Sequence, residues 1–205
     1  MSDVAAPSSA SPAVRPLRAD ARRNRERVMK AARAVFGEQG RDAQMDDVAR
    51  KAKVGVGTVY RHFPTKEALL EALVRDQFAT LATWAREALE SDDAWAAFER
   101  LLWRGAALHA DDRSLAEATA DAKANVADHA AEESGLAAAI AELIARAQRQ
   151  GAMRPDLRPE DLTAMFCGLG SVMHRDAGDP LAWRRYLSLM IDGMRAAPGH
   201  ADLPA

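Results

Sequence analysis

Several side chains near position 60 are suited to the non-covalent recognition of a charged polymer. Thr58, Tyr60, Arg61 and His62 lie close together in the sequence, and Lys66 follows them. Their hydroxyl, guanidinium, imidazole and ammonium groups all donate hydrogen bonds. The planar arginine fork matches phosphate oxygens or the edge of a guanine base. The chemistry that this set offers is therefore the binding of phosphates and base edges.

Two short helices joined by a tight corner would position these side chains. The stretch MDDVARKA, residues 45–52, places apolar residues at the i, i+3 and i+4 spacing of a helix. The corner that follows is too short for anything but a sharp turn, and Val56 to Phe63 forms the second helix. Thr65 then caps a third helix that opens at Lys66. The pattern predicts a helix-turn-helix, whose second helix fits the major groove of DNA.

The segment from about Arg22 to Leu81 resembles the tetracycline-repressor (TetR) family of transcriptional regulators. A leading helix that ends in VFGEQG, then MDDVARKAKV, then GVGTVYRHFPTKEALLEALV carry this resemblance. The run TVYRHF followed by a Pro-Thr-Lys turn is its specific part. The family usually has a glycine where this chain has Lys53, and a positive φ there would cost a lysine about 1 kcal/mol. The family often has Ser or Thr where this chain has Gln44, so the cap of the first motif helix stays open.

The resemblance implies binding to double-stranded DNA, with backbone phosphates contacted by Thr58, Tyr60, His62 and Lys66. Small residues at the start of the second helix would let it approach the bases closely. The expected DNA-contacting residues are Arg22, Arg23, Gln44, Met45, Val56, Gly57, Thr58, Tyr60, Arg61, His62 and Lys66. Packing of Tyr60 between helices and a solvent-facing Arg61 are the alternatives.

The charge distribution fits this assignment. Residues 15–66 hold 14 Lys and Arg against 6 Asp and Glu, a net charge of +8. Residues 67–205 hold 14 against 23, a net charge of −9, and Asp3 brings the total to −2. A basic half beside an acidic half indicates that the basic half meets a polyanion. The arginines that precede the motif are expected either on phosphates, in an adjacent minor groove, or on a solvated helix face.

Length and composition predict an all-α protein with a substantial core. The chain has 205 residues, 48% of them hydrophobic, and β-branched alternation is scarce. A single cysteine, Cys167, fits a reducing cytoplasm, and the sequence contains no apolar run long enough to span a membrane. The N-terminus does not have the pattern of a secretory signal. We therefore expect a cytoplasmic protein.

The expected organisation is a disordered tail (1–17), a DNA-binding head (18–66, with the motif at about 44–63), a larger body (67–197) and a tail (198–205). The first helix is expected from about Asp20 to Gln39, with Val28, Ala32, Val35 and Phe36 buried. A helix from Lys66 into the 70s is expected to be followed almost directly by another. A further helix is expected to begin after Asp92 or Asp93, and a shorter one to end at about Ala124. Three more are expected: one from Leu136 to Gly151, one that begins at Pro159, and one that begins after Asp179-Pro180. The stretch Asn125–Ser134 can be either loop or helix.

The body contains the material for an apolar pocket. Phe98, Leu102, Trp103 and Phe166 are the candidates for its lining, with His109 as a polar group. The resemblance implies that a small inducer binds in this region and shifts the spacing of the two DNA-reading heads. The alternative is that these aromatic residues simply fill the core.

The last two helices carry the strongest apolar stripes, which suggests self-association. The resemblance implies a dimer interface of two helices from each chain. The expected interface residues are Met165, Leu169, Met173, Trp183, Leu187, Met190, Ile191 and Met194. The alternative is an intrachain core face. A two-fold dimer predicts a palindromic operator, because the symmetry of the site mirrors that of the protein.

No catalytic constellation accompanies these features. The sequence has no GxSxG, P-loop, HExxH or CxxC motif, and its histidines lack the i, i+4 spacing of a helical metal pair. We expect no enzyme, no cofactor and no metal. The sequence predicts a transcriptional regulator, namely a repressor that binds operator DNA and is released by a small-molecule inducer. A ligand-independent activator or architectural protein, or a regulator that binds a protein partner, is the alternative.

Overall fold

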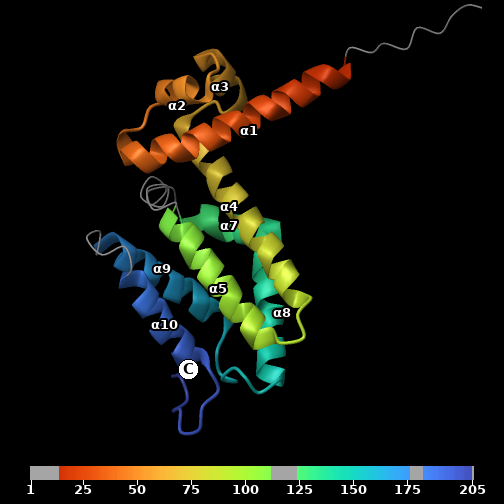
Figure 1. Ribbon diagram of the computed structural model, residues 1–205, viewed down its shortest axis with the longest axis vertical. Coiled ribbons are helices and arrows are strands. Elements are labelled where there is room, and N and C mark those ends of the chain that lie inside the picture. Colours follow the sequence, from red (N-terminus) through yellow and green to blue (C-terminus); the bar gives the residue numbers. More distant parts are fainter. Residues whose placement is uncertain (1–13, 112–123, 176–181, 205) are drawn as a thin grey trace, which may run out of the picture.

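The computed structural model describes residues 14–111, 124–175 and 182–204 (Figure 1). The described residues fold into helices and contain no strand, apart from an isolated bridge between Met153 and Arg195. Within these ranges no helix is both long and apolar enough to cross a membrane. The all-α fold class predicted from composition is confirmed.

The head is formed by the N-terminal helices. It comprises α1 (Val14–Gln39), the short 3-10 helix η1 (Gly40–Asp42), α2 (Met45–Ala52) and α3 (Val56–His62). The predicted stripe of α1 is buried, with Val28, Ala32 and Phe36 fully inaccessible to solvent. Val59 and Phe63 close the same core from α3 and its C-terminal cap. The head therefore has a hydrophobic core of its own.

Helix α1 begins earlier than expected. The structure starts it at Val14 rather than near Asp20, so residues 14–17 of the expected tail are helical. Pro16 does not prevent this, because the first turn of a helix has no intrahelical partners for its N–H groups. The N-terminal part of α1 extends beyond the rest of the head as an arm (Figure 1).

Helix α4 (Lys66–Leu89) is one continuous helix, so the predicted division into two helices is wrong. Its 24 residues span about 36 Å at 1.5 Å per residue. Leu69, Leu70 and Leu73 complete the head core, whereas Ala82 and Ala85 belong to the body core. The apolar stripe of α4 changes face between these two groups because each group packs in a different core. In the sequence, this change of face looks like the end of one helix and the start of another. The head thus extends past the expected boundary at Lys66.

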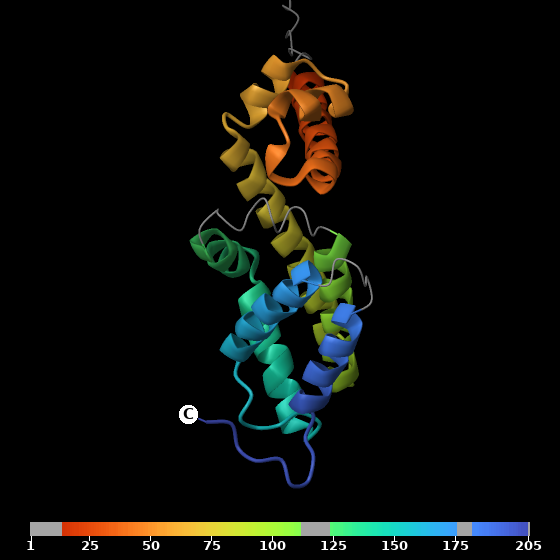
Figure 2. The ribbon, with the colours of Figure 1, turned by 90° about the vertical axis from the view of Figure 1, so that its left-hand side faces the viewer.

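The body packs the remaining helices around α4. They are α5 (Ala94–Asp111), α7 (Ala124–Ser134), α8 (Leu136–Arg149), α9 (Pro159–Arg175) and α10 (Ala182–Met194). Helices α7, α8 and α5 pack directly against α4, and α9 and α10 lie at the front of the body in Figure 2. The core at their centre includes Phe98, Leu143, Leu169 and Leu187, all fully buried.

Several predicted helix boundaries are confirmed. The Asp93 carboxylate accepts a hydrogen bond of 2.9 Å from the Ala96 N–H, so Asp93 caps α5. Pro159 is the first residue of α9, and the Asp161 carboxylate accepts a bond of 2.9 Å from the Arg158 N–H. The ambiguous stretch 125–134 is helical and belongs to α7. The expected helix up to Ala124 and the Asp179-Pro180 cap fall mostly outside the described residues.

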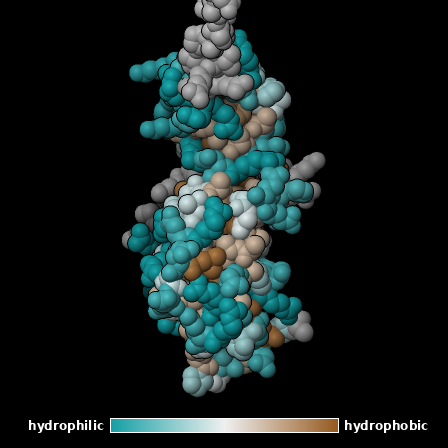
Figure 3. Space-filling view, turned by 90° about the vertical axis from the view of Figure 1, so that its right-hand side faces the viewer, coloured by the Kyte–Doolittle hydropathy of each residue, from teal (hydrophilic) through white to brown (hydrophobic). Residues whose placement is uncertain are grey.

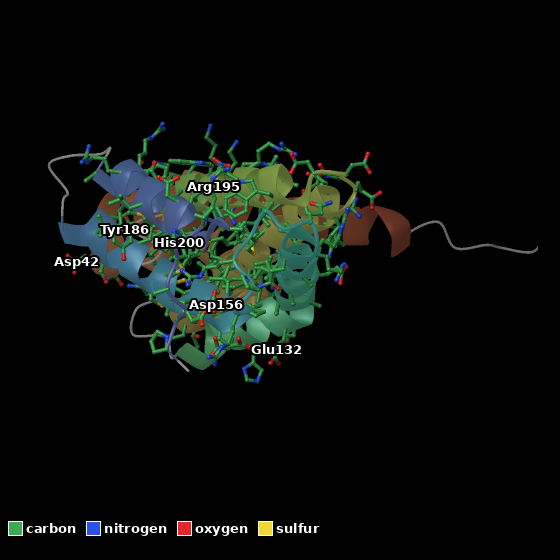
Figure 4. The ribbon with its side chains drawn as sticks, turned by 90° about the horizontal axis from the view of Figure 1, so that it is seen from below. Asp42, Glu132, Asp156, Tyr186, Arg195 and His200 are labelled. Carbon is green, nitrogen blue, oxygen red and sulfur yellow. The ribbon has the colours of Figure 1, made fainter. Side chains whose placement is uncertain are left out.

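The segment after α10, expected to be a tail, makes hydrogen bonds with the body. Arg154 forms an ion pair with Asp156, at 2.6 Å between Nε and Oδ1, and donates to the carbonyl of Ala201 at 2.8 Å. The Leu203 N–H donates to the Asp156 carboxylate at 2.7 Å. Figure 4 labels Asp156 and His200 at this end of the body, seen from below.

Candidate nucleic-acid interface

Helix α3 has one buried and one exposed face. Val59 is completely buried, while Val56 and Tyr60, four residues apart, are 42% and 47% exposed. Residues four apart lie on the same side of a helix, so these two large side chains share one outward face. Packing of Tyr60 in the core, the alternative left open by the sequence, is wrong.

Two glycines border this exposed face, although no neighbouring atom of the chain would clash with a side chain at either position. A Cβ built on Gly55 or on Gly57 would meet no atom within 4 Å. Gly57 lies inside α3, where glycine costs about 1 kcal/mol relative to alanine. Since packing within the chain does not require the missing side chain, the open space is available to a surface that approaches from outside.

Polar groups surround this face on α3 and at the start of α4. Arg61 is exposed, whereas Thr58 and His62 are half-buried. The half-buried Lys66 has its Nζ 5.6 Å from the centroid of the Phe36 ring. The structure thus brings the hydrogen-bonding residues predicted on α3 and α4 to one end of the head.

The N-terminus of α4 already holds a carboxylate of its own chain. Thr65 caps the helix, as predicted, by accepting a bond of 3.1 Å from the Ala68 N–H. The pKa of Glu67 is lowered, first by a hydrogen bond from its own backbone N–H, then by the Thr65 hydroxyl, with a smaller effect of Lys66. The first turn of α4 therefore already carries a negative charge, and the Lys66 ammonium lies close enough to this carboxylate to lower its pKa.

The start of α2 turns its first side chain inward. Met45 is only 6% exposed, so its side chain belongs to the head core, and its expected contact with DNA stays a prediction. The same spacing that makes α2 amphipathic places Met45 with Val48 and Ala49 on the core side. Gln44 is exposed, and its amide donates to the Asp42 carbonyl at 2.9 Å instead of capping α2. Gln44 therefore keeps a side chain at the surface.

The corner between α2 and α3 adopts the left-handed conformation that the glycine-rich family pattern implies. Lys53 has φ 55° and ψ 46°. The Val54 N–H bonds to the Ala49 carbonyl at 3.1 Å, and the Lys53 N–H bonds to the Arg50 carbonyl at 3.2 Å. These two bonds form a Schellman motif, whose left-handed position is usually glycine. A lysine in this conformation costs about 1 kcal/mol, as expected from the sequence.

The arginines of the α1 arm are exposed but carry partners. The side chains of Arg22 and Arg23 are 75% and 61% exposed, and they form ion pairs with Glu26 and Asp20 on the same helix. Exposed pairs of this kind contribute about 0–1 kcal/mol. A DNA phosphate can therefore replace either carboxylate at little cost.

The residues predicted for a ligand pocket are brought together between α5, α9 and α10. Phe98 and Leu102 are buried in the body core, and the Trp103 and Trp183 rings lie 6.1 Å apart between centroids. A Cβ built on Gly105 would lie 4.0 Å from the Phe166 ring, and one built on Gly170 would lie 3.1 Å from Nε2 of His109. Phe98, Leu102, Trp103 and Phe166 thus belong to one hydrophobic cluster, and His109 lies beside Gly170 of α9. A shallow hollow of about 160 Å³ lies elsewhere, between α4 and α5 around Trp84 and Arg104.

The apolar stripes of α9 and α10 face inward. All the predicted interface residues except the half-buried Met165 are buried within a single chain: Leu169, Met173, Trp183, Leu187, Met190, Ile191 and Met194. Within one chain these residues therefore belong to the body core, and their assignment to a dimer interface stays a prediction. An apolar stripe marks the side of a helix that is covered, but a monomer core covers it as well as a partner does.

The outer faces of α9 and α10 carry residues that the sequence reasoning missed. Leu189 is 69% exposed, the highest exposure among the large hydrophobic side chains of the described residues. Exposed neighbours line the same two helices: Thr163, Ala164, Cys167 and Ser171 on α9, and Arg185, Ser188 and Asp192 on α10. The signal in the sequence was Leu189 itself, an apolar residue outside the buried stripe. The face that carries α4 and α8 is mainly hydrophilic, with only small apolar patches (Figure 3).

Two family models match this chain, one over the head and one over the body. "Bacterial regulatory proteins, tetR family" matches residues 28–73, and "Transcriptional regulator SbtR-like, C-terminal domain" matches residues 90–196. Together they cover the helix-turn-helix and almost all of the helices that follow it.

Solved structures and a curated relative agree with these matches. A TetR regulator from Mycobacterium vanbaalenii is 34% identical, with a TM-score of 0.65 over 88% of this chain and 99% of that one. A TetR regulator from Streptomyces coelicolor is 30% identical, with a TM-score of 0.64 over 84% and 99%. The HTH-type transcriptional regulator UidR of Escherichia coli (strain K12) is 37% identical over 76 residues, 36% of this chain and 38% of its own length. The match to this curated relative thus spans less than two thirds of it.

The matched segments coincide with the two cores of the structure. The first covers the helix-turn-helix head and the second covers the helical body, and full-length structural relatives at 30% identity or more join both parts in one chain. The chain belongs to the TetR family of bacterial transcriptional regulators, and its head is the DNA-binding part of such a regulator.

Proposed function

We propose that this protein is a homodimer that binds a palindromic operator in the cytoplasm and represses transcription until a small-molecule inducer releases it. The observation that carries the DNA-reading part is the outward face of α3, where Val56 and Tyr60 are exposed beside two glycines with open space around them. A helix with small residues at its start can lie deep in a major groove. Thr58, Tyr60, Arg61, His62 and Lys66 are the proposed polar contacts, with Arg22, Arg23 and Gln44 at the edges.

Release by an inducer is supported by the course of α4. Its first turns complete the head core and its later turns complete the body core. Arg33 of α1 also holds Asp76 of α4 at 2.8 Å. A ligand that moves α4 within the body would therefore move the head with it, and two heads would lose their match to successive major grooves.

A ligand-independent regulator is the second candidate, because two of the predicted pocket residues, Phe98 and Leu102, are buried in the body core. Phe98 is completely buried and Leu102 is 3% exposed. Under the inducer proposal the ligand would have to open this packing. A compound that raises the Tm of the free protein and also lowers its DNA affinity would favour release by an inducer over this candidate.

Tyr60 gives the sharpest test of the DNA-reading face, because its exposure makes a change there nearly neutral for folding. A duplex enriched by the wild-type protein from a random-sequence pool serves as the probe, and fluorescence anisotropy measures its binding over a salt series. We expect Tyr60→Phe, which removes only the hydroxyl, to weaken binding by about 10-fold or more, as for one lost hydrogen bond to a charged group. Tyr60→Ala should weaken it further.

Tyr186→Phe is the matched control, since this tyrosine lies on α10 in the body. The control should bind like the wild type. Unchanged binding by Tyr60→Ala would exclude α3 as the DNA-reading face, and no enrichment of any duplex by the wild type would reject the proposed function as a whole.

A further inference from the structure

Lys53 occupies the one position of the described residues where a residue other than glycine has a positive φ. It is the left-handed residue of the Schellman motif that ends α2. An unfavourable backbone conformation that persists in a fold points to a function of the residue that adopts it. The question is what the lysine supplies that glycine would not.

The fold does not need the lysine side chain. The motif is closed by backbone hydrogen bonds of residues 53 and 54, and by Val54, which packs against the head core. Glycine would make the same backbone bonds without a steric penalty. The Lys53 side chain is exposed and contributes nothing to this core.

The charge of Lys53 also has no partner within the described part of the chain. Two other cations lie in the last turn of α2, and both are paired: Arg50 with Asp47 at 2.9 Å, and Lys51 with Glu38. Lys53 forms no such ion pair with any described residue. Its ammonium group is therefore fully available to an external anion.

The position of Lys53 places this cation beside the proposed DNA-reading face. Gly55 is the N-cap of α3, and the exposed Val56 begins that helix. Lysine carries its charge on a flexible four-carbon stem, which suits a contact with a phosphate as a point charge. The open space around Gly55 leaves room for a DNA strand to approach.

We infer that Lys53 binds a phosphate of the DNA backbone at the edge of the major groove that α3 enters. This inference rests on the proposed function and adds to it a contact residue at a position where the family usually has glycine. The strained backbone conformation at Lys53 is offset because the lysine charge strengthens binding to DNA of any base sequence.

Three substitutions at this position separate charge from conformation. Lys53→Gly removes both the charge and the strain, Lys53→Asn removes the charge but tolerates a positive φ, and Lys53→Arg keeps the charge. Binding to the enriched duplex and to a scrambled duplex is measured over a salt series. Each lost phosphate contact lowers the slope of log K against log salt by about 0.9, so a dimer should lose about 1.8.

We expect Lys53→Gly and Lys53→Asn to bind both duplexes roughly 10-fold or more weakly at 0.1 M salt, with this lower slope. Lys53→Arg should keep the wild-type slope. The Tm of Lys53→Gly should not fall, because glycine is favoured in this conformation. Lys51→Gln is the control: it removes a neighbouring lysine that is already paired with Glu38, and it should leave the slope nearly unchanged.

An unchanged affinity and slope for Lys53→Gly would overturn this inference. If Tyr60→Phe weakens binding in the same assay, only the role of Lys53 is rejected and the proposed function stands. If the wild type shows no DNA binding at all, the proposed function and the inference fail together.

Discussion

At the scale of single residues, the ion pair between Arg154 and Asp156 has the largest effect on a titratable group among the described residues. The pKa of Asp156 is held well below its usual range, first by the hydrogen bonds from Arg154 and then by the Leu203 N–H. The pKa of Arg154 is raised by the same carboxylate. Arg154 also donates to the carbonyls of Gly193 and Ala201, so the pair ties the C-terminal segment to the end of α10.

This pair predicts a defined pH dependence of stability. A carboxyl group whose pKa is lower in the folded than in the unfolded chain stabilises the fold above its unfolded pKa, here 3.8, and this stabilisation is lost as the pH falls from there towards the folded value. We expect Asp156→Asn to lower the Tm by a few degrees at pH 7, and the difference from the wild type to shrink below about pH 4. Thermal unfolding followed by circular dichroism at several pH values measures this.

Asp128→Asn, on the exposed surface of α7, is the control for this measurement. It should leave the Tm near that of the wild type at every pH. A Tm difference for Asp156→Asn that stayed constant from pH 7 to pH 3 would show that the carboxylate charge is not what holds the segment.

At the scale of elements, α9 and α10 use opposite faces for different purposes. Their inner faces complete the core of the monomer, with Leu169 and Leu187 fully buried. Their outer faces carry small and polar residues around the exposed Leu189. An exposed leucine among small side chains suits a close contact with the same face of a second copy, since a two-fold interface pairs identical surfaces.

This arrangement predicts the effect of a charge at Leu189. We expect Leu189→Glu to raise the dissociation constant of the homodimer by about 100-fold or more, because burying an unpaired carboxylate costs several kcal/mol. The monomer should stay folded, since this side chain is 69% exposed in one chain. Light scattering after size-exclusion chromatography, over a range of concentrations, measures the change.

Leu203→Glu is the matched control, because Leu203 is 41% exposed and lies outside α9 and α10. It should leave the oligomeric state unchanged. A dimer of normal strength in Leu189→Glu would place the interface on another surface.

At the scale of the whole molecule, α4 sets the position of the head relative to the body. It is the element shared by both cores, and its middle turns run between them (Figure 1). Arg75 and Arg86 fasten it to α7, by an ion pair with Glu133 and a hydrogen bond of 3.2 Å to the Ser134 carbonyl. A rigid α4 would fix the distance between two heads, and this distance selects the spacing of the half-sites.

This role predicts that loosening the middle of α4 affects the palindrome but not the half-site. We expect Gln77→Gly combined with Ala79→Gly to weaken binding to a full palindromic duplex by about 10-fold or more, while binding to a single half-site changes little, because each head keeps its own core. Each glycine should cost about 1 kcal/mol of stability. Anisotropy with the two duplexes measures the difference.

The matched control places two glycines nearer the C-terminal end of α4, where Ala82 and Ala85 belong to the body core. Thr83→Gly with Glu87→Gly should cost similar stability but leave the preference for the palindrome intact. If both double variants lost that preference equally, the joint between head and body would not be what sets the spacing.

The local architecture of the head could be predicted from the sequence alone. The spacing of Met45, Val48 and Ala49, the Thr65 cap and the corner at Lys53 all follow from interactions within a few residues, and the structure confirms each of them. The all-α class and the stripe of α1 could be predicted for the same reason. Short-range hydrogen bonds and helical periodicity need no knowledge of distant parts of the chain.

What covers each apolar stripe could be seen only once the helices were placed in space. The sequence shows that one side of α10 is apolar, but it does not show whether the chain's own core or a partner covers Leu187. It likewise could not show that α4 continues through a change of face. Burial depends on which helices meet, and that choice is made by the packing of residues far apart in the sequence.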